Sequence, residues 1–263
     1  MKKGNHKSIV IMIIICLLSV LAMMVIIVGS SNQVTEEKVA DSYIMPETSG
    51  MDMGELYETA KKCVVCISMK QSVGSGIIWE ISEDGIIIVS SKHLLLEDVE
   101  GVVTFWNGQE LRAEITAYSQ QHDIGYLKIS EENIPEELKQ EIYTVRHPLN
   151  TKISEDEILW TVGEPVLQIG YLQKEEVHFE GEVKDKQFMP EFNEDMLQTL
   201  CYAKAGMSGG AVFDRYGNLL GMISGGAVEE EAKEREADIT YSIPVEVLEE
   251  EYNNSQIMER HGY

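Results

Sequence analysis

Short runs of β-branched and apolar residues, separated by turn-forming residues, recur along most of this chain and limit its fold more than any other feature. In the first half the expected strands are Cys63–Met69, Gly76–Ile81, Ile86–Ser90, Val102–Trp106, Glu110–Tyr118 and Gly125–Ile129. After a polar, acidic connector over residues 130–140, they are Pro165–Tyr171, Val177–Val183, Leu197–Ala203, Ala211–Phe213, Leu219–Ile223 and Ile239–Ile243. Short strands spaced by about 8–12 residues and split once by a connector predict two packed barrels or sandwiches.

Turn and helix signals complete this pattern. The dipeptide Asn107-Gly108 stands between two expected strands and predicts a type I′ hairpin. The segments 83–85 (EDG) and 214–217 (DRYG) turn the chain between other neighbouring strands. Only the tail from Pro244 to about Met258 has a helical pattern, and Pro244 suits the first turn of a helix. The expected fold class is therefore all-β with one C-terminal helix.

An uncharged apolar run precedes the strands. From Ile9 to Val28 the only polar side chain is that of Ser19, and the run is long enough to cross a hydrocarbon layer of about 30 Å as a helix. Three lysines stand before it, which keeps that end cytoplasmic. The run predicts a cytoplasmic tail over 1–8, a transmembrane anchor over 9–28, and a single-pass membrane protein whose main domain is extracytoplasmic.

Two other processing routes compete with an uncleaved anchor. A cleaved signal peptide has an apolar core of only about 7–15 residues, although residues 28–30 (VGS) form an acceptable cleavage site. A lipoprotein needs a small residue just before its cysteine, and Cys16 follows three isoleucines. The length of the run favours the anchor. Residues 29–55 are polar with little periodicity, which predicts a flexible stalk.

Acidic residues dominate the charge. The chain has 45 Asp+Glu against 21 Lys+Arg, a formal net charge of −24, and three of the lysines precede the predicted anchor. This balance argues against nucleic acid or an anionic membrane surface as a partner. A basic substrate or partner fits it, but a solvated acidic surface that aids solubility explains it more simply.

The four cysteines do not form a disulfide scaffold. Cys63 and Cys66 have the spacing of a redox or zinc pair, but no second pair follows at ligand spacing. Positions three apart in a strand point to opposite faces, so two small buried residues explain this pair better. Cys201 has no evident partner. We therefore expect no metal and no cofactor.

The segment 206–210 (GMSGG) places a serine between glycines just before an expected strand. Gly206 permits backbone angles that are closed to other residues, so its N–H can point inward with that of Ser208 as an oxyanion hole. Gly209 and Gly210 leave room for a substrate backbone. Taken alone, the segment is equally typical of a structural glycine-rich turn.

A serine nucleophile needs a base and a group that orients the base. Of the six histidines, His93 follows an apolar strand and precedes a short helical piece, a position that holds an imidazole rigidly at a barrel rim. Asp123 comes just before another strand, where a partly buried carboxylate needs a hydrogen-bonding partner. Each residue by itself also fits a structural role, His93 as a buried histidine and Asp123 as a turn or strand cap.

Together these segments resemble the chymotrypsin-like serine peptidases, and in particular the bacterial HtrA (DegP-like) branch. The resemblance covers roughly residues 57–250, with the family's order of His, Asp and Ser. The segments that carry it are GSGIIWEISEDGIIIVSSKHLL (74–95), HDIGYLKI (122–129), GEPVLQIGY (163–171), GMSGGAVFDRYGNLLGMISG (206–225) and TYSIPVEVLEE (240–250).

The resemblance implies a fold of two six-stranded antiparallel β-barrels, about 56–130 and 141–245, in a protease domain over 56–263. It implies that His93 is general base and then acid, that Asp123 orients it, and that Ser208 attacks the scissile carbonyl. The N–H groups of Gly206 and Ser208 would hold the oxyanion.

Substrate-binding positions follow from the same resemblance. Ser224, Gly225 and Gly226 would pair with an extended substrate backbone. The floor of the specificity pocket would lie near residues 200–203, including Tyr202, and its wall near 224–227. These segments offer no selecting charge, so we expect a small-to-medium apolar preference.

The sequence departs from the branch at several positions. Met207 replaces an Asn or Asp, Lys204 and Ala205 replace Asn-Pro, and Lys92 stands where a small or polar residue is common. These changes are expected to affect the order of the loop or the oxyanion hole. The chain to Tyr263 carries no PDZ domain, so gating by that module is not expected.

The expected function is that of a membrane-anchored serine endopeptidase acting on proteins outside the cytoplasm. A second hypothesis is a catalytically silent binding or sensing module with the protease fold, which the departures at 204, 205 and 207 favour. A third, a redox protein that uses Cys63 and Cys66, is favoured by their spacing alone.

Overall fold

The computed structural model describes residues 43–50, 52–96, 98–146, 160–226 and 239–261, the last seven by their backbone alone. The predicted anchor over 9–28 and residues 29–42 of the predicted stalk lie outside this set. Within these described ranges, no helix is both long enough and apolar enough to span a membrane.

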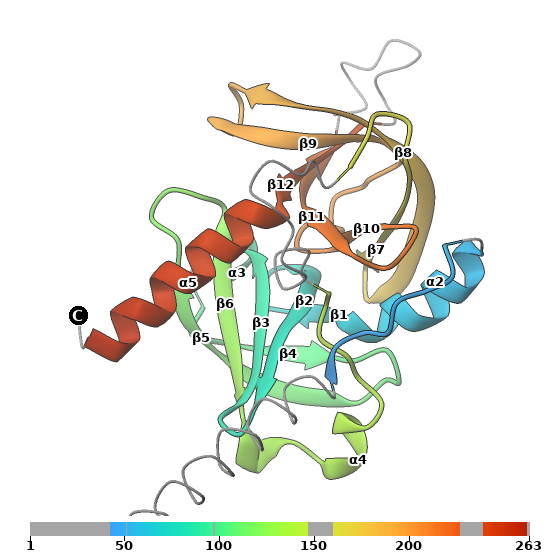
Figure 1. Ribbon diagram of the computed structural model, residues 1–263. Helices are drawn as coiled ribbons and strands as arrows, with labels where there is room; N and C mark the ends of the chain where they lie inside the picture. Colours follow the sequence, from blue (N-terminus) through green and yellow to red (C-terminus); the bar gives the residue numbers. More distant parts are fainter. Residues whose placement is uncertain (1–42, 51, 97, 147–159, 227–238, 262–263) are drawn as a thin grey trace, which may run out of the picture. The chain divides into compact units, whose positions relative to one another are not determined.

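The first half of the described chain forms a closed antiparallel barrel (Figure 1). Its strands pair around the barrel in the order β1-β2-β3-β6-β5-β4. Short helical segments α3 (Lys92–Leu95), η3 (Glu131–Asn133) and α4 (Glu136–Lys139) follow β3 and β6. The six strands are β1 (Val64–Ser68), β2 (Val73–Ser82), β3 (Gly85–Ser91), β4 (Glu100–Thr104), β5 (Glu110–Tyr118) and β6 (Ile124–Ser130).

The second half forms another closed antiparallel barrel, in the order β10-β11-β12-β9-β8-β7. Its strands are β7 (Pro165–Leu172), β8 (Glu175–Met189), β9 (Glu194–Leu200), β10 (Ala211–Asp214), β11 (Leu219–Gly226) and β12 (Ile239–Pro244). Helix α5 (Val245–His261) follows directly from β12. The predicted two six-stranded barrels with a C-terminal helix are confirmed.

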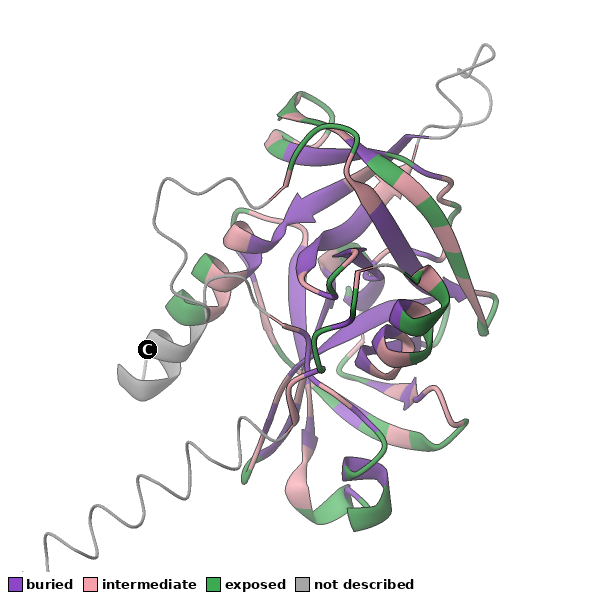
Figure 2. Ribbon diagram, turned by 45° about the vertical axis from the view of Figure 1, so that its right-hand side comes forward, coloured by how far each residue is buried: buried purple, intermediate pink, exposed green. Residues whose placement is uncertain are grey.

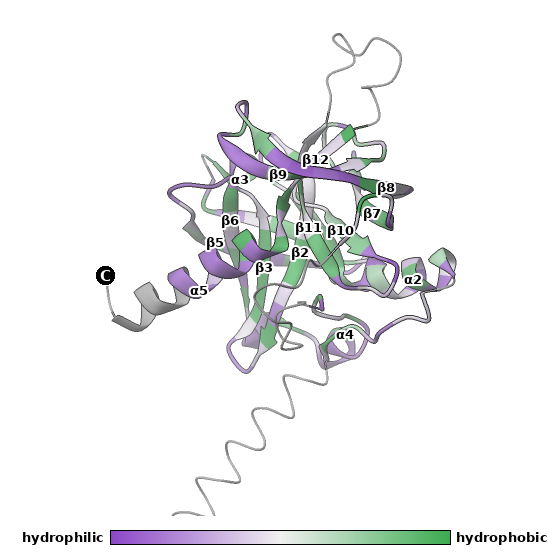
Figure 3. Ribbon diagram, turned by 45° about the horizontal axis from the view of Figure 1, so that its top comes forward, coloured by the Kyte–Doolittle hydropathy of each residue, from purple (hydrophilic) through white to green (hydrophobic). Residues whose placement is uncertain are grey.

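Apolar side chains fill both barrels. In β3 and β6 the apolar run is almost wholly buried, and in Figure 2 these strands are largely purple. The hydropathic colouring of Figure 3 is green along β2, β3 and β11, while the outer strand β8 is mainly purple. One cluster of buried residues includes Ile77 from the first barrel and Phe213 from the second, so the two barrels share a continuous core.

Strand β8 differs most from its expected range. It extends six residues past the predicted end at Val183, to Met189, and pairs with β9 from Glu182↔Leu200 to Met189↔Glu194. The extension contains Lys184, Asp185 and Lys186, and its residues are exposed or half-buried, so its composition does not indicate a strand. The pairing with β9 supplies the hydrogen bonds that the local sequence does not indicate.

The Asn107-Gly108 hairpin is present, but its turn is not type I′. That type requires a positive φ at both central residues, and here only Gly108 has one, at 82°. The Gly108 N–H donates to the Phe105 carbonyl instead, and the Asn107 side chain accepts from the Gln109 N–H. Two consecutive positive φ values, 50° and 74°, occur at Gln173 and Lys174 between β7 and β8.

The described part of the predicted stalk makes fixed contacts. Ile44 forms a parallel bridge with Thr144, and the Met45 side chain is fully buried. Helix α2 (Met53–Ala60) begins within the same segment, with the Asp52 carboxylate accepting from the Gly54 N–H as an N-cap. The 3-10 segment η2 (Lys61–Cys63) then leads into β1. Residues 43–50 and 52–55 are therefore part of the folded domain.

Helix α5 returns the end of the chain to the first barrel. Val245 and Leu248 are buried, and the Tyr252 ring packs 5.8 Å from the rings of both Trp79 and Tyr126. The Tyr252 hydroxyl donates to Glu80 in β2 at 2.5 Å. The helix therefore links the end of the second barrel to β2 and β6 of the first.

Candidate active site

His93 lies where β3 gives way to α3. The last residue of β3, Ser91, is extended, and the buried side chains of Leu94 and Leu95 fix the short helix against the barrel. The Lys92 N–H donates to the Asp123 carbonyl at 3.2 Å. These contacts hold the backbone of His93, while about half of its side-chain surface, 53%, stays exposed.

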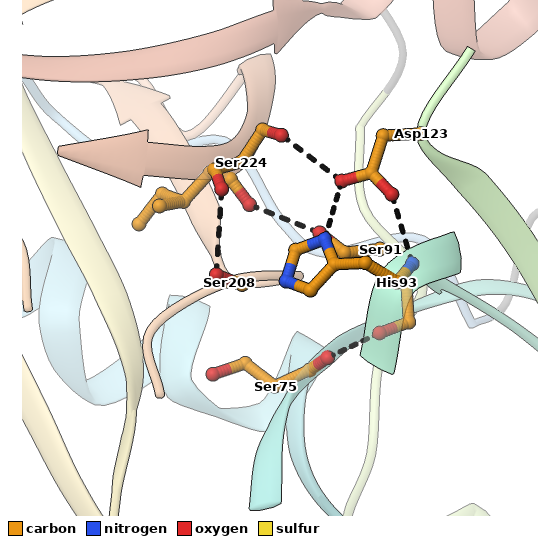
Figure 4. A network of polar contacts seen from close by, with 8 residues as sticks. Ser75, Ser91, His93, Asp123, Ser208 and Ser224 are labelled. Atoms are coloured by element: carbon orange, nitrogen blue, oxygen red, sulfur yellow. Dashed lines mark hydrogen bonds and ion pairs between the residues drawn. The ribbon is translucent and has the colours of Figure 1, made fainter. Parts of the chain in front are cut away.

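Asp123 lies in the loop between β5 and β6 and binds His93 twice. The His93 Nδ1 is 2.7 Å from Asp123 Oδ2, and the His93 backbone N–H donates to Oδ1 at 2.9 Å. The Ser224 hydroxyl donates to Oδ2 at 3.1 Å. Figure 4 shows the side chains of His93 and Ser224, together with the His93 backbone N–H, converging on this carboxylate. Three donors therefore fix the carboxylate and, through it, the plane of the imidazole.

The pair shifts the pKa values of both members. The hydrogen bond to Asp123 raises the pKa of His93; burial opposes this change, and the carboxylate charge adds to it. Burial alone would raise the pKa of Asp123, but bonds from the His93 side chain and backbone, the His93 charge and the Ser224 hydroxyl together hold it below its ordinary value. Asp123 is thus a carboxylate that stabilises a protonated His93.

Ser208 lies in the loop before β10, on the other side of the imidazole. Its hydroxyl donates to the Ser224 carbonyl at 3.4 Å. In Figure 4 the second ring nitrogen of His93, Nε2, is turned to the side of Ser208. With Nδ1–H directed to Asp123, Nε2 carries the lone pair of the neutral ring. The structure therefore brings Ser208, His93 and Asp123 into one site.

Gly206 gives the loop its shape. Residues 204–207 form a turn in which the Met207 N–H donates to the Lys204 carbonyl at 2.9 Å. Gly206 is the third residue of this turn, with a φ of 109°, which disfavours any side chain there. Within the described part of the chain, no acceptor receives a hydrogen bond from the N–H of Gly206 or Ser208, whereas the N–H groups of Met207, Gly209 and Gly210 are all bonded.

Met207 anchors the same loop by packing. Its side chain is fully buried among apolar residues of the second barrel, including Val166, Leu197 and Val212. The departure from Asn or Asp therefore replaces polar fixation of the loop with burial. Lys92 is another residue at which the sequence departs from the branch. Its Nζ donates to the Ser119 carbonyl at 2.8 Å and so binds the loop that carries Asp123.

We expect Met207→Ala to lower the free energy of unfolding by about 2–5 kcal/mol, since it leaves a cavity in the second barrel. The nucleophile loop loses its apolar anchor in the same variant, so activity per folded molecule should fall too. Met207→Leu is the matched control and should cost less than about 1.5 kcal/mol. Urea unfolding measures both. A Met207→Ala change as small as that of the leucine variant would contradict this role.

Ser75 in β2 ties the nucleophile loop to the first barrel, a role that no local sequence signal indicates. Its N–H donates to the Ser208 carbonyl at 2.9 Å, and its hydroxyl donates to the Gly206 carbonyl at 3.2 Å. The same hydroxyl accepts the Tyr171 N–H at 2.8 Å. A β carbon at Gly209 would lie 2.1 Å from the Ser75 carbonyl oxygen, so this close approach requires glycine.

Ser224, Gly225 and Gly226 end β11 beside the triad. The pairing of β10 with β11 stops at Ala211↔Met222, so beyond it one edge of β11 has no strand partner among the described residues. The pairing with β12 shifts register between Ile223 and Gly225. A bulge of this kind changes the direction of a side chain. Here the Ser224 hydroxyl donates to Asp123, and the Ser224 backbone carbonyl accepts from the Ser208 hydroxyl.

Tyr202, expected at the floor of the specificity pocket, contacts β8. Its ring packs edge-on against Phe179 of β8, with the centroids 5.0 Å apart. Between the expected floor and wall of the specificity pocket, Gly226 lies close to Ala203: a β carbon at Gly226 would lie 3.3 Å from the Cβ of Ala203, which is tighter than ordinary van der Waals contact.

The cysteines are placed as structural residues. Cys63, Cys66 and Cys201 are buried, and none of them is in a disulfide within the described part of the chain. Burial raises the pKa of the Cys63 and Cys66 thiols, opposed weakly by Lys62 at Cys63 and by the Ser68 hydroxyl and Lys174 at Cys66. A raised pKa disfavours the reactive thiolate. In the ranges that the structure covers, no group of three or more His, Cys, Asp or Glu side chains has a metal-binding arrangement.

Two six-stranded barrels with a His-Asp pair and a serine at their junction define the chymotrypsin-like class of serine peptidase folds. The model of the trypsin-like peptidase domain family matches residues 74–222, more than half of the chain. The chain therefore belongs to this family, and its domain is of the serine endopeptidase type. No curated protein matches the chain.

Solved structures of HtrA-type proteases share the fold. A variant of the protease AlgW with a tripeptide matches with a TM-score of 0.63 and 20% identity, over 81% of this chain and 65% of its own. Another structure of AlgW with a tripeptide gives 0.63 and 20%, over 80% and 64%. The serine endoprotease from Yersinia pestis gives 0.59 and 22%, over 80% and 66%. This chain thus spans somewhat less than two thirds of each of these structures.

Proposed function

We propose that the protein is a membrane-anchored serine endopeptidase that cleaves peptide bonds of extracytoplasmic proteins through an acyl-enzyme intermediate. The observation that carries the proposal is the His93–Asp123 pair at 2.7 Å, with Ser208 beside it in a loop whose Gly206 and Ser208 N–H groups are free of acceptors among the described residues. The membrane anchor and the extracytoplasmic location rest on the apolar run over 9–28 and its preceding lysines.

Each residue has one role in this chemistry. Neutral His93 takes the Ser208 proton at Nε2 as the hydroxyl attacks the scissile carbonyl, and later returns a proton to the leaving amine. Asp123 holds the ring in the required tautomer and stabilises the imidazolium that forms. The N–H groups of Gly206 and Ser208 stabilise the oxyanion of the tetrahedral intermediate. Water then hydrolyses the acyl-enzyme by the same steps, and no metal or cofactor enters.

The free edge of β11 supports an extended peptide as the substrate. The edge at residues 224–226 offers backbone donors and acceptors to an added antiparallel strand, which would lead the scissile bond to Ser208. Residues 200–203 and 224–226 place no acidic or basic side chain that would select a charged residue except in the neighbouring Lys204, so a small-to-medium apolar side chain is expected at the cleaved residue. Protein or peptide substrates with such residues are therefore expected.

The silent-module hypothesis has one observation in its favour. The Ser208 hydroxyl donates to the Ser224 carbonyl, and this bond must break or be shared before His93 can take the proton. At 3.4 Å the bond is long, so its loss costs little. Covalent labelling of the serine distinguishes a silent module from a peptidase.

We expect a fluorophosphonate probe to label Ser208, and the labelling rate to fall as pH drops. Only neutral His93 acts as a base, and its hydrogen bond to Asp123 raises its pKa, so the midpoint should lie above the ordinary value near 6.5. Labelling rates from pH 5 to 9, with mass spectrometry of the modified peptide, test this. Absence of labelling in folded protein would refute the peptidase, and a rate that is flat through neutral pH would refute His93 as the base.

A further inference from the structure

His122, the residue before Asp123, lies between two carboxylates from distant elements. Its Nδ1 is 2.7 Å from Glu194 Oε1 in β9, and its Nε2 is 3.8 Å from Glu251 Oε1 in α5. All three side chains are mostly buried, with exposed fractions of 23% for His122, 10% for Glu194 and 18% for Glu251. One imidazole therefore connects the Asp123 loop of the first barrel with a strand of the second barrel and with the C-terminal helix.

Local bonds shape this loop. The Ser119 hydroxyl accepts the N–H groups of Gln121 and His122 at 3.1 and 3.0 Å. The Ser119 carbonyl accepts from Lys92 Nζ at 2.8 Å. These contacts come from the first barrel alone, so they fix the form of the loop and leave the link to the second barrel and α5 to other residues.

A pocket of about 230 Å³ lies between the loop and α5, lined by Tyr118, Ser119, Gln120, Gln121, Tyr126, Glu251 and Asn254. Side chains across an open pocket gain few van der Waals contacts. The ion pairs of His122 therefore provide the polar connection between the two sides.

Electrostatics add to this role, because three carboxylates meet here. The pKa of Glu194 is raised, and burial is the largest cause. The charges of Glu251 and Asp123 also raise it, while His122 lowers it. The charges of Glu251 and Asp123 therefore reach Glu194, and the His122 imidazole is the group that contacts both Glu194 and Glu251. Without it, the repulsion favours a loop position that draws Asp123 away from the other two.

We propose that His122 is a positioning residue for the triad: by bridging Glu194 and Glu251 it fixes Asp123 against His93 and couples the active site to the seating of helix α5. The inference rests on the proposed peptidase function for its effect on rate. Its structural part, the fixation of Asp123, is independent of that function. A displacement of α5 would then loosen Asp123 without any change in a residue of the triad.

The test compares His122→Gln, Glu194→Gln and Glu251→Gln with wild type in the full chain. We expect fluorophosphonate labelling to slow about tenfold in His122→Gln and about threefold in Glu251→Gln, since small displacements of catalytic groups cost rate steeply. Amides of residues 119–123 should exchange faster with solvent, while those of the barrel strands do not. The downfield proton resonance of His93 Nδ1–H should broaden or vanish in the same variants.

Two exposed neighbours give matched controls. Glu250→Gln and Asp195→Asn each remove one charge beside the cluster, from exposed side chains of α5 and β9, and should stay within twofold of wild type. The inference would be overturned if His122→Gln and Glu251→Gln kept the labelling rate, the amide exchange and the Nδ1–H resonance of wild type. It would also be overturned if the control variants lost as much labelling rate as these two. If His122→Gln does not fold, Glu251→Gln carries the same test. If wild type is not labelled, the peptidase proposal fails, and exchange and the resonance still decide the inference.

Discussion

Replacing Ser208 with alanine should reduce peptide-bond cleavage about 10⁶-fold while leaving the fold intact. The hydroxyl is the atom that bonds to the substrate carbonyl, so without it no acyl-enzyme forms. The catalysis that remains, about 10³–10⁴ over water, comes from the oxyanion hole and substrate binding alone. The structural cost is small, because within the described residues the hydroxyl makes one hydrogen bond, at 3.4 Å, worth less than about 1 kcal/mol.

Cleavage kinetics and thermal unfolding of the same preparation measure the two parts of this expectation. Ser82→Ala is a suitable control, since Ser82 ends β2 away from the triad and its hydroxyl accepts the Asp84 N–H at 3.3 Å. Ser208→Ala should match it in unfolding temperature and differ from it in cleavage. Full cleavage by Ser208→Ala would show that another group is the nucleophile, and unfolding of this variant would show that Ser208 has a structural role.

The barrels were predictable because their strands carry the signal in their own residues. The run 86–90 (IIIVS) and the segment 165–171 (PVLQIGY) are apolar and β-branched, since both are buried in a barrel wall. The triad was predictable because its three segments resemble the HtrA branch in the same order. His93, Asp123 and Ser208 each lie within three residues of the end of a strand, but this placement alone also fits structural roles.

Other features depend on contacts that no local pattern records. Residues 184–189 form the end of β8 because β9 pairs with them, although their charges resemble a loop. The positive φ values fall at Gln173 and Lys174, residues without the turn preference of Asn-Gly, because the two-residue connection between β7 and β8 imposes them. The contacts of Ser75 with the nucleophile loop and β7, and those of His122 with Glu194 and Glu251, join residues at least 72 positions apart, beyond the reach of spacing arguments.

The departures from the HtrA pattern have structural explanations at two positions. Met207 places a buried apolar anchor where the branch has a polar one, and Lys92 uses its long side chain to bind the carbonyl of Ser119. Both fix a loop that carries a triad residue. The departures therefore change how the site is held without removing any of its chemical groups.

Asp123→Asn should lower the turnover number about 10⁴-fold with only a small change in stability. An asparagine amide that keeps the bond to the His93 N–H turns its own NH₂ toward Nδ1. Nδ1 must then accept, which moves the ring proton to Nε2, and Nε2 can no longer take the proton of Ser208. The loss of the carboxylate also removes the hydrogen bond that raises the pKa of His93, so any remaining activity should have its midpoint at lower pH.

Ser224→Ala distinguishes the role of the Asp123 carboxylate itself from that of the hydrogen bond that supports it. It removes one donor to Asp123 at 3.1 Å and leaves the 2.7 Å pair with His93 in place, so we expect a loss of about tenfold. Steady-state kinetics across pH, with nuclear magnetic resonance of the His93 ring nitrogens, measure both variants. If Asp123→Asn lost no more activity than Ser224→Ala, Asp123 would be a structural residue of its loop. The hydrogen bond between His93 Nδ1 and Asp123 would then have no part in setting the tautomer of the His93 ring.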